Sequence, residues 1–360
     1  MQIEEVITKK QQKEFLNFRK KLYRDNAVYV DNFLFMLQEL FARKTSFVND
    51  KKIHAFQVSE EGKTVCQGIV VYAKALPEYI QLCFFESLPG RKEAAGRLLE
   101  KAVELGKQYQ CKKLVIGLNG HVNYGLGLLC NRYEEKNSFS AAVNPAYYHE
   151  LLGGEDCEKI YLNTYRTVAD YNRLKRYGAL LGKLERYYTY RTFDRKAFDT
   201  FAKIYTDLNN EAFKDHRYYY ERTYREDREM LKELFLFMKE DSLIFAFHGE
   251  KPVGFVMWYP DFNELAGPGE AFGAKHFFKN LAVGRRITTG KIMEYGVLEE
   301  YRKSGLVIGL LDQVFKALQR HGIQNVKSSW ILQENRDSDS VCRALCDEPH
   351  KRYVVYEKTI

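Results

Sequence analysis

A turn with two cations and two glycines lies between Arg302 and Gly309, after an apolar segment that begins near Lys291. Apolar side chains recur at helical spacing beyond it, so the segment is predicted to run strand, tight turn, helix. The first amides of a helix have no acceptor within the helix, and the helix dipole makes that end positive. Glycine at Gly305 would also let a ligand approach the backbone. The spacing therefore predicts a phosphate site at this turn.

The same residues resemble the pyrophosphate loop of the GNAT acyltransferases. That loop reads Arg or Gln, two residues, Gly, one residue, then Gly or Ala. Arg302 and Gly305 match it, and Val307 stands at the second small position. The resemblance implies that acetyl-CoA or another acyl-CoA is the co-substrate. The residues expected to bind it are Arg302, Lys303, Ser304, Gly305, Leu306, Val307 and Asn335. Asn335 can instead cap the helix that follows it.

Acyl transfer from a thioester to an amine needs a base, an oxyanion donor and an acid for the thiolate. The strand before the phosphate turn often supplies the first two in GNAT enzymes, so the resemblance implies Glu294 as the base. Tyr295 is the alternative on the opposite face of the strand, because counting does not fix the face. Cys342 stands where related enzymes place a tyrosine acid, which leaves the acid unassigned. Without a visible activating group, Cys342 is expected to be a small buried residue.

Other segments place the turn in a larger fold. Residues 242–247 and 253–259 predict a hairpin, residues 324–332 a strand, and residues 353–358 a final strand after a helix that ends near Leu345. The segments Trp330–Arg336 and Tyr353–Lys358 look like those of a group of bacterial two-domain GNAT-like proteins. This resemblance covers nearly the whole chain.

The first half repeats the order of the second. His54–Phe56 followed by Gly68–Tyr72 parallels Phe245–Phe247 followed by Gly254–Trp258, which suggests two copies of one fold. In the first half, strands are predicted at 3–7, 53–58, 65–72, 80–86 and 114–118, and helices at 11–24, 31–43 and 95–105.

The fold class is therefore predicted as α+β, with tandem GNAT-like domains over residues 1–178 and 179–360. Each half is expected to hold its own mixed, mainly antiparallel sheet flanked by helices, with a helix between its fourth and fifth strands. Residues 87–92 lack the Arg-x-x-Gly-x-Gly spacing, so no CoA site is expected in the first half.

Two long connections are functional candidates because loops of this length are uncommon in compact domains. Residues 119–158 hold Asn123, Tyr147 and Tyr148, which either contact the acceptor or pack between the domains and satisfy their hydroxyls there. Residues 261–289 carry several phenylalanines, and they form a lid, dock on lipid, or pack on the other half.

Composition limits the remaining possibilities. The 360 residues exceed one usual core, and the charge of +8 comes from 56 basic residues interleaved with 48 acidic ones, so nucleic acid is not the expected partner. The seven cysteines show no metal-ligand spacing, and no apolar signal sequence or run of roughly 20 apolar residues is visible. A cytoplasmic protein without a metal site or transmembrane segment is expected.

The leading hypothesis is an acyl-CoA dependent N-acyltransferase whose acceptor is a small-molecule or peptide amine. Two alternatives stay open. A degenerate GNAT pair would bind a small molecule or a protein without catalysis, and Val307 and the missing tyrosine favour it. An aminoacyl-tRNA dependent transferase of the Fem type would account for the positive charge, although no charged heptad pair for its helical arm is visible.

Overall fold

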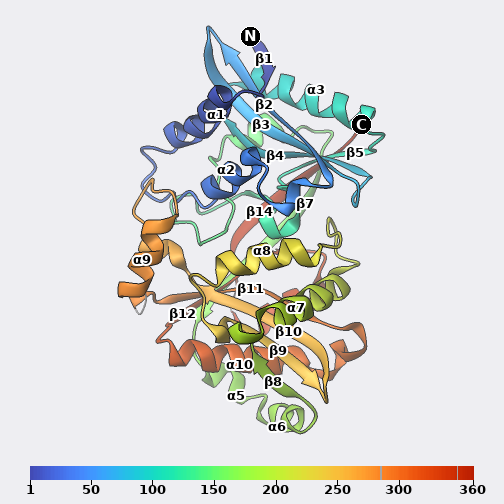
Figure 1. The fold of residues 1–360 in the computed structure, drawn as a ribbon, viewed down its shortest axis with the longest axis vertical. Helices are drawn as coiled ribbons and strands as arrows, with labels where there is room; N and C mark the ends of the chain where they lie inside the picture. Colours follow the sequence, from blue (N-terminus) through green and yellow to red (C-terminus); the bar gives the residue numbers. More distant parts are fainter. Residues whose placement is uncertain (284–285, 347) are drawn as a thin grey trace.

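A computed structural model describes residues 1–283, 286–346 and 348–360 (Figure 1). The elements of the first half are β1 (Gln2–Glu5), α1 (Lys9–Leu22), α2 (Leu34–Ala42), β2 (Lys51–Glu60), β3 (Lys63–Ala73), β4 (Tyr79–Ser87), α3 (Lys92–Gln108), β5 (Lys113–Ile116), β6 (Leu128–Leu129), α4 (Tyr148–Leu152) and β7 (Glu158–Val168). Those that follow are α5 (Asn172–Lys175), α6 (Gly178–Tyr187), β8 (Thr189–Thr192), α7 (Phe198–Phe213), α8 (Tyr224–Leu234), β9 (Leu243–His248), β10 (Lys251–Pro260), α9 (Ala274–Val283), β11 (Thr289–Val297), α10 (Leu306–Arg320), β12 (Asn325–Ser328), β13 (Ile331–Leu332), α11 (Arg336–Leu345) and β14 (Pro349–Thr359).

The strands form one hydrogen-bonded path in the order β1-β2-β3-β4-β5-β14-β7-β12-β11-β10-β9-β8. Pairing along it is antiparallel except at β4/β5 and β11/β12, where the helices α3 and α10 make the crossover connections. The predicted fold class, a mixed and mainly antiparallel sheet flanked by helices, is confirmed. The predicted helix between the fourth and fifth strands is present in both halves, as α3 and α10.

The expectation that each half holds its own sheet is wrong. The last strand, β14, returns to the first half and pairs with β5 at Tyr356↔Ile116 and with β7 at Tyr353↔Leu162. Figure 1 shows this strand, in red, within the upper half of the molecule. In turn, β7 pairs with β12 at Thr167↔Val326. The halves thus share strands, because each needs a partner for its fifth strand, and the division at residue 178 stays a prediction.

Residues 1–178 alone are expected to aggregate, because removal of β14 exposes the edge of β5 and takes Val354 and Tyr356 out of the first core. Because β14 begins beside the end of β7, at Pro349↔Tyr165, a short glycine-serine turn can join residues 1–168 to 349–360. The joined chain is expected to be monomeric and to unfold cooperatively in urea. If residues 1–178 were instead monomeric and unfolded cooperatively, the first half would have a complete core without β14.

Helices on opposite faces of the second-half sheet direct alternate residues of β11 to different environments. Helix α10 packs on β9, β10 and β11 on one face, and α7 packs on β10 and β11 on the other. Ile292 and Tyr295 lie against the core under α10, whereas Met293 lies in the core under α7. In α7 the buried side chains include Ala202, Tyr205 and Asn209, a helical stripe that faces the sheet.

Both long connections pack between the halves. Phe139 N donates to Asp261 Oδ1 at 2.8 Å, and Asn263 Nδ2 donates to the carbonyl of Asn137 at 2.8 Å. The segment 261–289, of which residues 284–285 lie outside the described residues, also pairs with the first half through the bridge Asp31↔Ala271. These contacts agree with the interpretation in which the two long connections pack between the halves.

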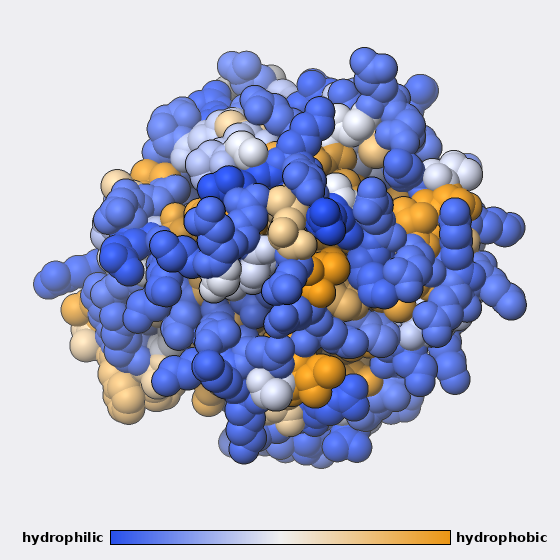
Figure 2. Space-filling view, turned by 90° about the horizontal axis from the view of Figure 1, so that it is seen from above, coloured by the Kyte–Doolittle hydropathy of each residue, from blue (hydrophilic) through white to orange (hydrophobic). Residues whose placement is uncertain are grey.

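Seen from the end that carries β1 and α3, hydrophilic side chains dominate the surface and hydrophobic ones form small scattered patches (Figure 2). Among the described residues, no helix combines the length and the apolar character that a membrane crossing requires.

Candidate active site

The strands β11 and β12 separate after a short parallel ladder. Their register runs from Thr289↔Asn325 to Ile292↔Ser328, and Ser329 N donates to Ile292 O at 2.7 Å. Beyond this point the chain bends away, and β13 pairs with β7 instead. On its other side β11 shifts register against β10 beside Met257, so that Met293 is an extra residue in a bulge. The later part of β11 therefore borders an opening between strands.

A cavity fills this opening. Residues from β11, β12, α10, α11, the end of α7 and the first half line it. Five of the residues singled out in the sequence come together there: Glu294, Tyr295, Asn335, Cys342 and Asn123. Asn123 is the contribution of the first half among these five, so both halves build the site.

Two side chains of α7 hold the carboxylate of Glu294. The hydroxyl of Tyr205 donates to Oε1, and Asn209 Nδ2 donates to Oε2 at 3.2 Å. Burial raises the pKa of Glu294, while the hydrogen bond from Tyr205 and the charge of Arg222 act in the opposite direction. Many protein atoms lie around the carboxylate. The side chain is nevertheless only half-buried, because one side of it faces the cavity. A carboxylate of raised pKa beside a cavity suits a general base.

Sequence reasoning missed Tyr205 and Asn209. They are four residues apart on α7, so they share one helix face, and both are buried. A tyrosine and an asparagine on an otherwise apolar stripe were a signal for a buried polar partner, although the sequence does not say which one.

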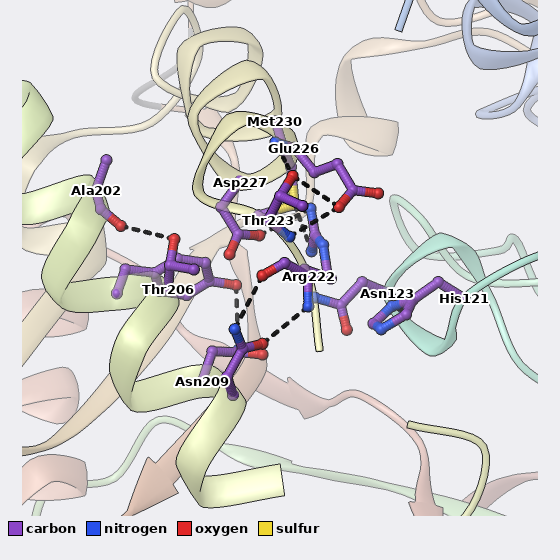
Figure 3. A network of polar contacts seen from close by, with 12 residues as sticks. His121, Asn123, Ala202, Thr206, Asn209, Arg222, Thr223, Glu226, Asp227 and Met230 are labelled. Atoms are coloured by element: carbon purple, nitrogen blue, oxygen red, sulfur yellow. Dashed lines mark hydrogen bonds and ion pairs between the residues drawn. The ribbon is translucent and has the colours of Figure 1, made fainter. Parts of the chain in front are cut away.

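A buried ion pair supports the same region. Arg222 Nη2 lies 2.8 Å from Asp227 Oδ1, and each side chain is 1% exposed. Figure 3 shows Arg222 between Asp227 of α8 and the first-half residues His121 and Asn123. His121 Nε2 lies 3.0 Å from the carbonyl of Tyr220. The pair therefore lies where the halves meet and beside the cavity.

Tyr295 and Cys342 face the cavity from the α10 side. Burial raises the pKa of the Tyr295 hydroxyl, and the neighbouring Ser338 side chain opposes that rise. Burial also raises the pKa of the Cys342 thiol to about 12. A thiol with this pKa stays protonated near neutral pH, which agrees with the expected role of Cys342 as a buried small residue rather than a nucleophile.

The predicted phosphate turn forms a 3-10 helix, η7 (Glu299–Ser304), followed by α10. The Arg302 guanidinium donates to the carbonyls of Val297, at 3.3 Å, and of Ala212, at 2.9 Å, and thereby ties the turn to α7. Gly305 has a φ of +81°, a conformation that favours glycine. A Cβ there would lie 3.0 Å from Leu180 of α6. Helix α6 thus covers one flank of the turn, while the Lys303 side chain is exposed.

The remaining predicted residues lie as follows. Asn335 caps α11, because its Oδ1 accepts from Ser338 N at 3.1 Å, and it also lines the cavity. Tyr147 and Tyr148 lie outside the cavity, in the first half. Tyr147 donates to the Ser87 carbonyl at 2.6 Å and Tyr148 to Glu86 Oε2 at 2.7 Å.

The chain itself narrows the corresponding opening between β4 and β5 to a cavity of about 40 Å³, against about 120 Å³ for the cavity in the second half. Phe84, in the bulge of β4, donates its N–H to Asn119 Oδ1 at 3.0 Å. The segment after β5 folds back, with Gly127 N donating to the Gly117 carbonyl at 2.8 Å. The N–H of Phe84, which borders the opening in the first half, is thus already hydrogen-bonded to the side chain of Asn119.

Comparison with known proteins identifies this arrangement. Residues 199–345, from α7 to α11, match the model of the acetyltransferase (GNAT) family. A tandem GNAT protein from the clavulanic acid biosynthesis pathway has the same fold along the chain, with a TM-score of 0.55, 14% identity, and coverage of 99% of this chain and 98% of that one. Residues 199–345 thus match the GNAT family, and the fold along the whole chain is that of a tandem GNAT protein.

Two further relatives are more partial. "Protein YghO" of Escherichia coli (strain K12) is 28% identical over 191 residues, which cover 50% of this chain and 48% of that protein. The chain thus matches about half the length of this curated relative. A GCN5-related N-acetyltransferase from Kribbella flavida has a TM-score of 0.52 at 10% identity, over 99% of this chain and 71% of that one.

Proposed function

We propose that the protein is an acyl-CoA dependent N-acyltransferase that uses the opening between β11 and β12. The observation that carries this proposal is the half-buried carboxylate of Glu294, held by Tyr205 and Asn209 beside the cavity. The acceptor is a small-molecule or peptide amine, and the acyl donor is acetyl-CoA or a longer acyl-CoA.

In the proposed reaction the acceptor nitrogen attacks the thioester carbonyl, and Glu294 takes the proton that the nitrogen loses. The new C–N bond forms as the C–S bond breaks, and solvent protonates the departing thiolate. Cys342 is not assigned the role of general acid. Its thiol, with a pKa of about 12, is a weaker acid than the thiol of free CoA, so it would not readily protonate the departing CoA thiolate. Peptide N–H groups of β11 beyond the ladder with β12 are candidates for the oxyanion donor.

The proposal places one acyl-CoA in each chain, in the second half. The residues proposed to hold it are Arg302 to Val307, at the start of α10, and Asn335 in the cavity. The first half is proposed to bind none, since the N–H of Phe84 is bonded to Asn119.

The structure adds an observation that favours the non-catalytic alternative. A Cβ at Gly309 would lie 2.0 Å from the hydroxyl of Tyr190, and Leu180 lies against Gly305, so protein side chains already cover part of the helix start.

A screen separates the catalytic and the non-catalytic possibilities. Amines are incubated with acetyl-CoA and with longer acyl-CoAs, and thiol release and acylated product are both measured. Binding of CoA without product from any amine would favour the degenerate pair. The Fem-type alternative predicts product with an aminoacyl-tRNA donor and none with acyl-CoA.

Lys303→Glu is expected to weaken acyl-CoA binding about tenfold, because it reverses an exposed charge at the proposed diphosphate site. Gly305→Glu would be a poorer test, since its φ and the contact with Leu180 predict strain without any ligand. Isothermal calorimetry gives the affinity, and Lys9→Glu, at the exposed start of α1, is the matched charge reversal. Equal affinity in Lys303→Glu and Lys9→Glu would place the diphosphate elsewhere.

A further inference from the structure

A second, smaller cavity of about 30 Å³ adjoins the candidate active site. The two cavities share Ser328, Ser329 and Trp330, where β12 ends and the chain bends away. Three lysines line the smaller cavity, one from each of three strands: Lys291, Lys327 and Lys351. Sequence reasoning did not single out these residues, because they are spread over 60 positions of the chain and meet only in the folded sheet.

The lysines share a face of the sheet with Glu294. Lys291 and Lys327 are direct partners in the parallel ladder, so their side chains leave the sheet on the same side. Ile292 points to the opposite face, towards α10, and the bulge at Met293 returns Glu294 to the face of Lys291. A molecule that spans the shared wall of the two cavities could therefore contact the lysines and Glu294 together.

Of the three lysines, only Lys327 forms an ion pair with a described residue, and Lys291 and Lys351 are buried without one. Lys291 is 4% exposed and Lys351 is 7% exposed. Asp261 lies 3.3 Å from Lys327, and Glu135 contacts His350 at 2.7 Å. Burial lowers the pKa of Lys291 to about 8, with Asp261 opposing and Lys327 adding to the shift.

Lys351 has the same character. Burial lowers its pKa to about 8, and the charge of Lys327 lowers it further, whereas Glu135, Glu134 and Asp261 oppose the shift. The pKa of the neighbouring His350 is also lowered by burial. A buried cation without a matching anion is costly, and an anionic ligand would remove that cost.

The segment 135–140 lies against the three lysines, and its hydrogen bonds use only part of the donor capacity of their ammonium groups. Lys291 donates to the carbonyl of Phe139 at 2.8 Å, and Lys327 donates to Ser138 Oγ at 3.1 Å. The ammonium group of Lys351 donates to the carbonyl of Glu135 at 3.0 Å, the one partner that the described residues give this group. Each ammonium group has three N–H donors, so Lys351 retains donors for a ligand.

We propose that Lys291, Lys327 and Lys351 bind the carboxylate of the acceptor, so that the acceptor is an amine that also carries a carboxylate. This inference rests on the proposed acyl transfer for the role of the ligand, but not for its binding. One water needs about 10–15 Å³, so the cavity has room for a group with two oxygen atoms. The carboxylate would fix the acceptor while its amine reaches Glu294.

The test compares matched ligands on the unaltered protein. The series runs from glycine to 6-aminohexanoate, and each member is paired with its amide, which has the same length without the charge. Calorimetry is expected to give at least tenfold tighter binding for the best acid than for its amide. Binding is also expected to take up protons near pH 8.5, because the carboxylate raises the pKa of lysines that are then partly neutral. Near pH 6.5, where the lysines are already charged, uptake should vanish.

Variants and turnover complete the test. Lys351→Met is expected to bring the acid-to-amide ratio towards one, while Lys358→Met, exposed on the same strand, should leave the ratio unchanged. Equal binding of acids and amides by the unaltered protein would overturn the inference whether or not acyl transfer occurs. Carboxylate binding with no transfer to any amine would keep the site and remove the proposed reaction. Acyl transfer with no preference for acids over amides would keep the proposed reaction and remove the carboxylate site.

Discussion

Glu294→Gln is expected to lower kcat/KM for acyl transfer by about 10²–10⁴-fold, the usual contribution of a positioned general base. Burial raises the pKa of this carboxyl, and only its deprotonated form can accept the amine proton. The proposed activity of the unaltered protein should therefore rise with pH through that raised pKa and level off above it. The Gln variant should lose this acid limb, because glutamine does not titrate, while its acyl-CoA affinity stays within a few fold.

Glu300→Gln is the matched control, since Glu300 is an exposed carboxylate on the neighbouring 3-10 helix, paired with Lys251 at 2.5 Å. It should retain both the rate and the pH profile. If Glu294→Gln turns over at the rate of the unaltered protein, the base is another group and the assignment fails.

Much of the local structure that surrounds Glu294 could be predicted from the sequence. The hairpin β9–β10, the strand β11 and the helices α10 and α11 lie within a few residues of the predicted segments, because each has a clear period or cap. The predicted strand at 324–332 is in fact two short strands, β12 and β13, with the bend at Trp330. That bend opens the site, and no turn signal of glycine or proline marks it in the sequence.

Long-range pairing could not be predicted. Nothing local in Tyr353–Lys358 says that this strand joins the first half, because its alternating apolar residues suit either sheet. The partners of Glu294 were missed for the same reason: Tyr205 lies 89 positions away and Asn209 lies 85 away.

Arg222→Met is expected to destabilise the protein by about 3–5 kcal/mol, because it leaves the buried carboxylate of Asp227 without its cation. Burial already raises the pKa of Asp227 above its ordinary value, and the charge of Arg222 opposes that rise. Without Arg222 the folded-state pKa rises further. The unfolded chain then loses its proton first as pH rises, so the penalty should grow with increasing pH and shrink on acidification. Urea unfolding at several pH values measures both effects.

Two further variants make this test specific. Arg222→Met combined with Asp227→Leu removes both charges and should recover part of the lost stability. Arg225→Met, in the exposed pair with Glu229 on the same helix, should change the free energy of unfolding by less than about 1 kcal/mol. Equal losses for Arg222→Met and Arg225→Met would mean that the buried pair contributes no more than a surface one.

A crystal structure of the protein with acetyl-CoA is the most direct test of the account. The proposed site predicts one molecule per chain, with its diphosphate at residues 302–307 and its thioester in the opening between β11 and β12, beside Glu294. Acetyl-CoA bound between β4 and β5 of the first half, or two molecules in each chain, would contradict it.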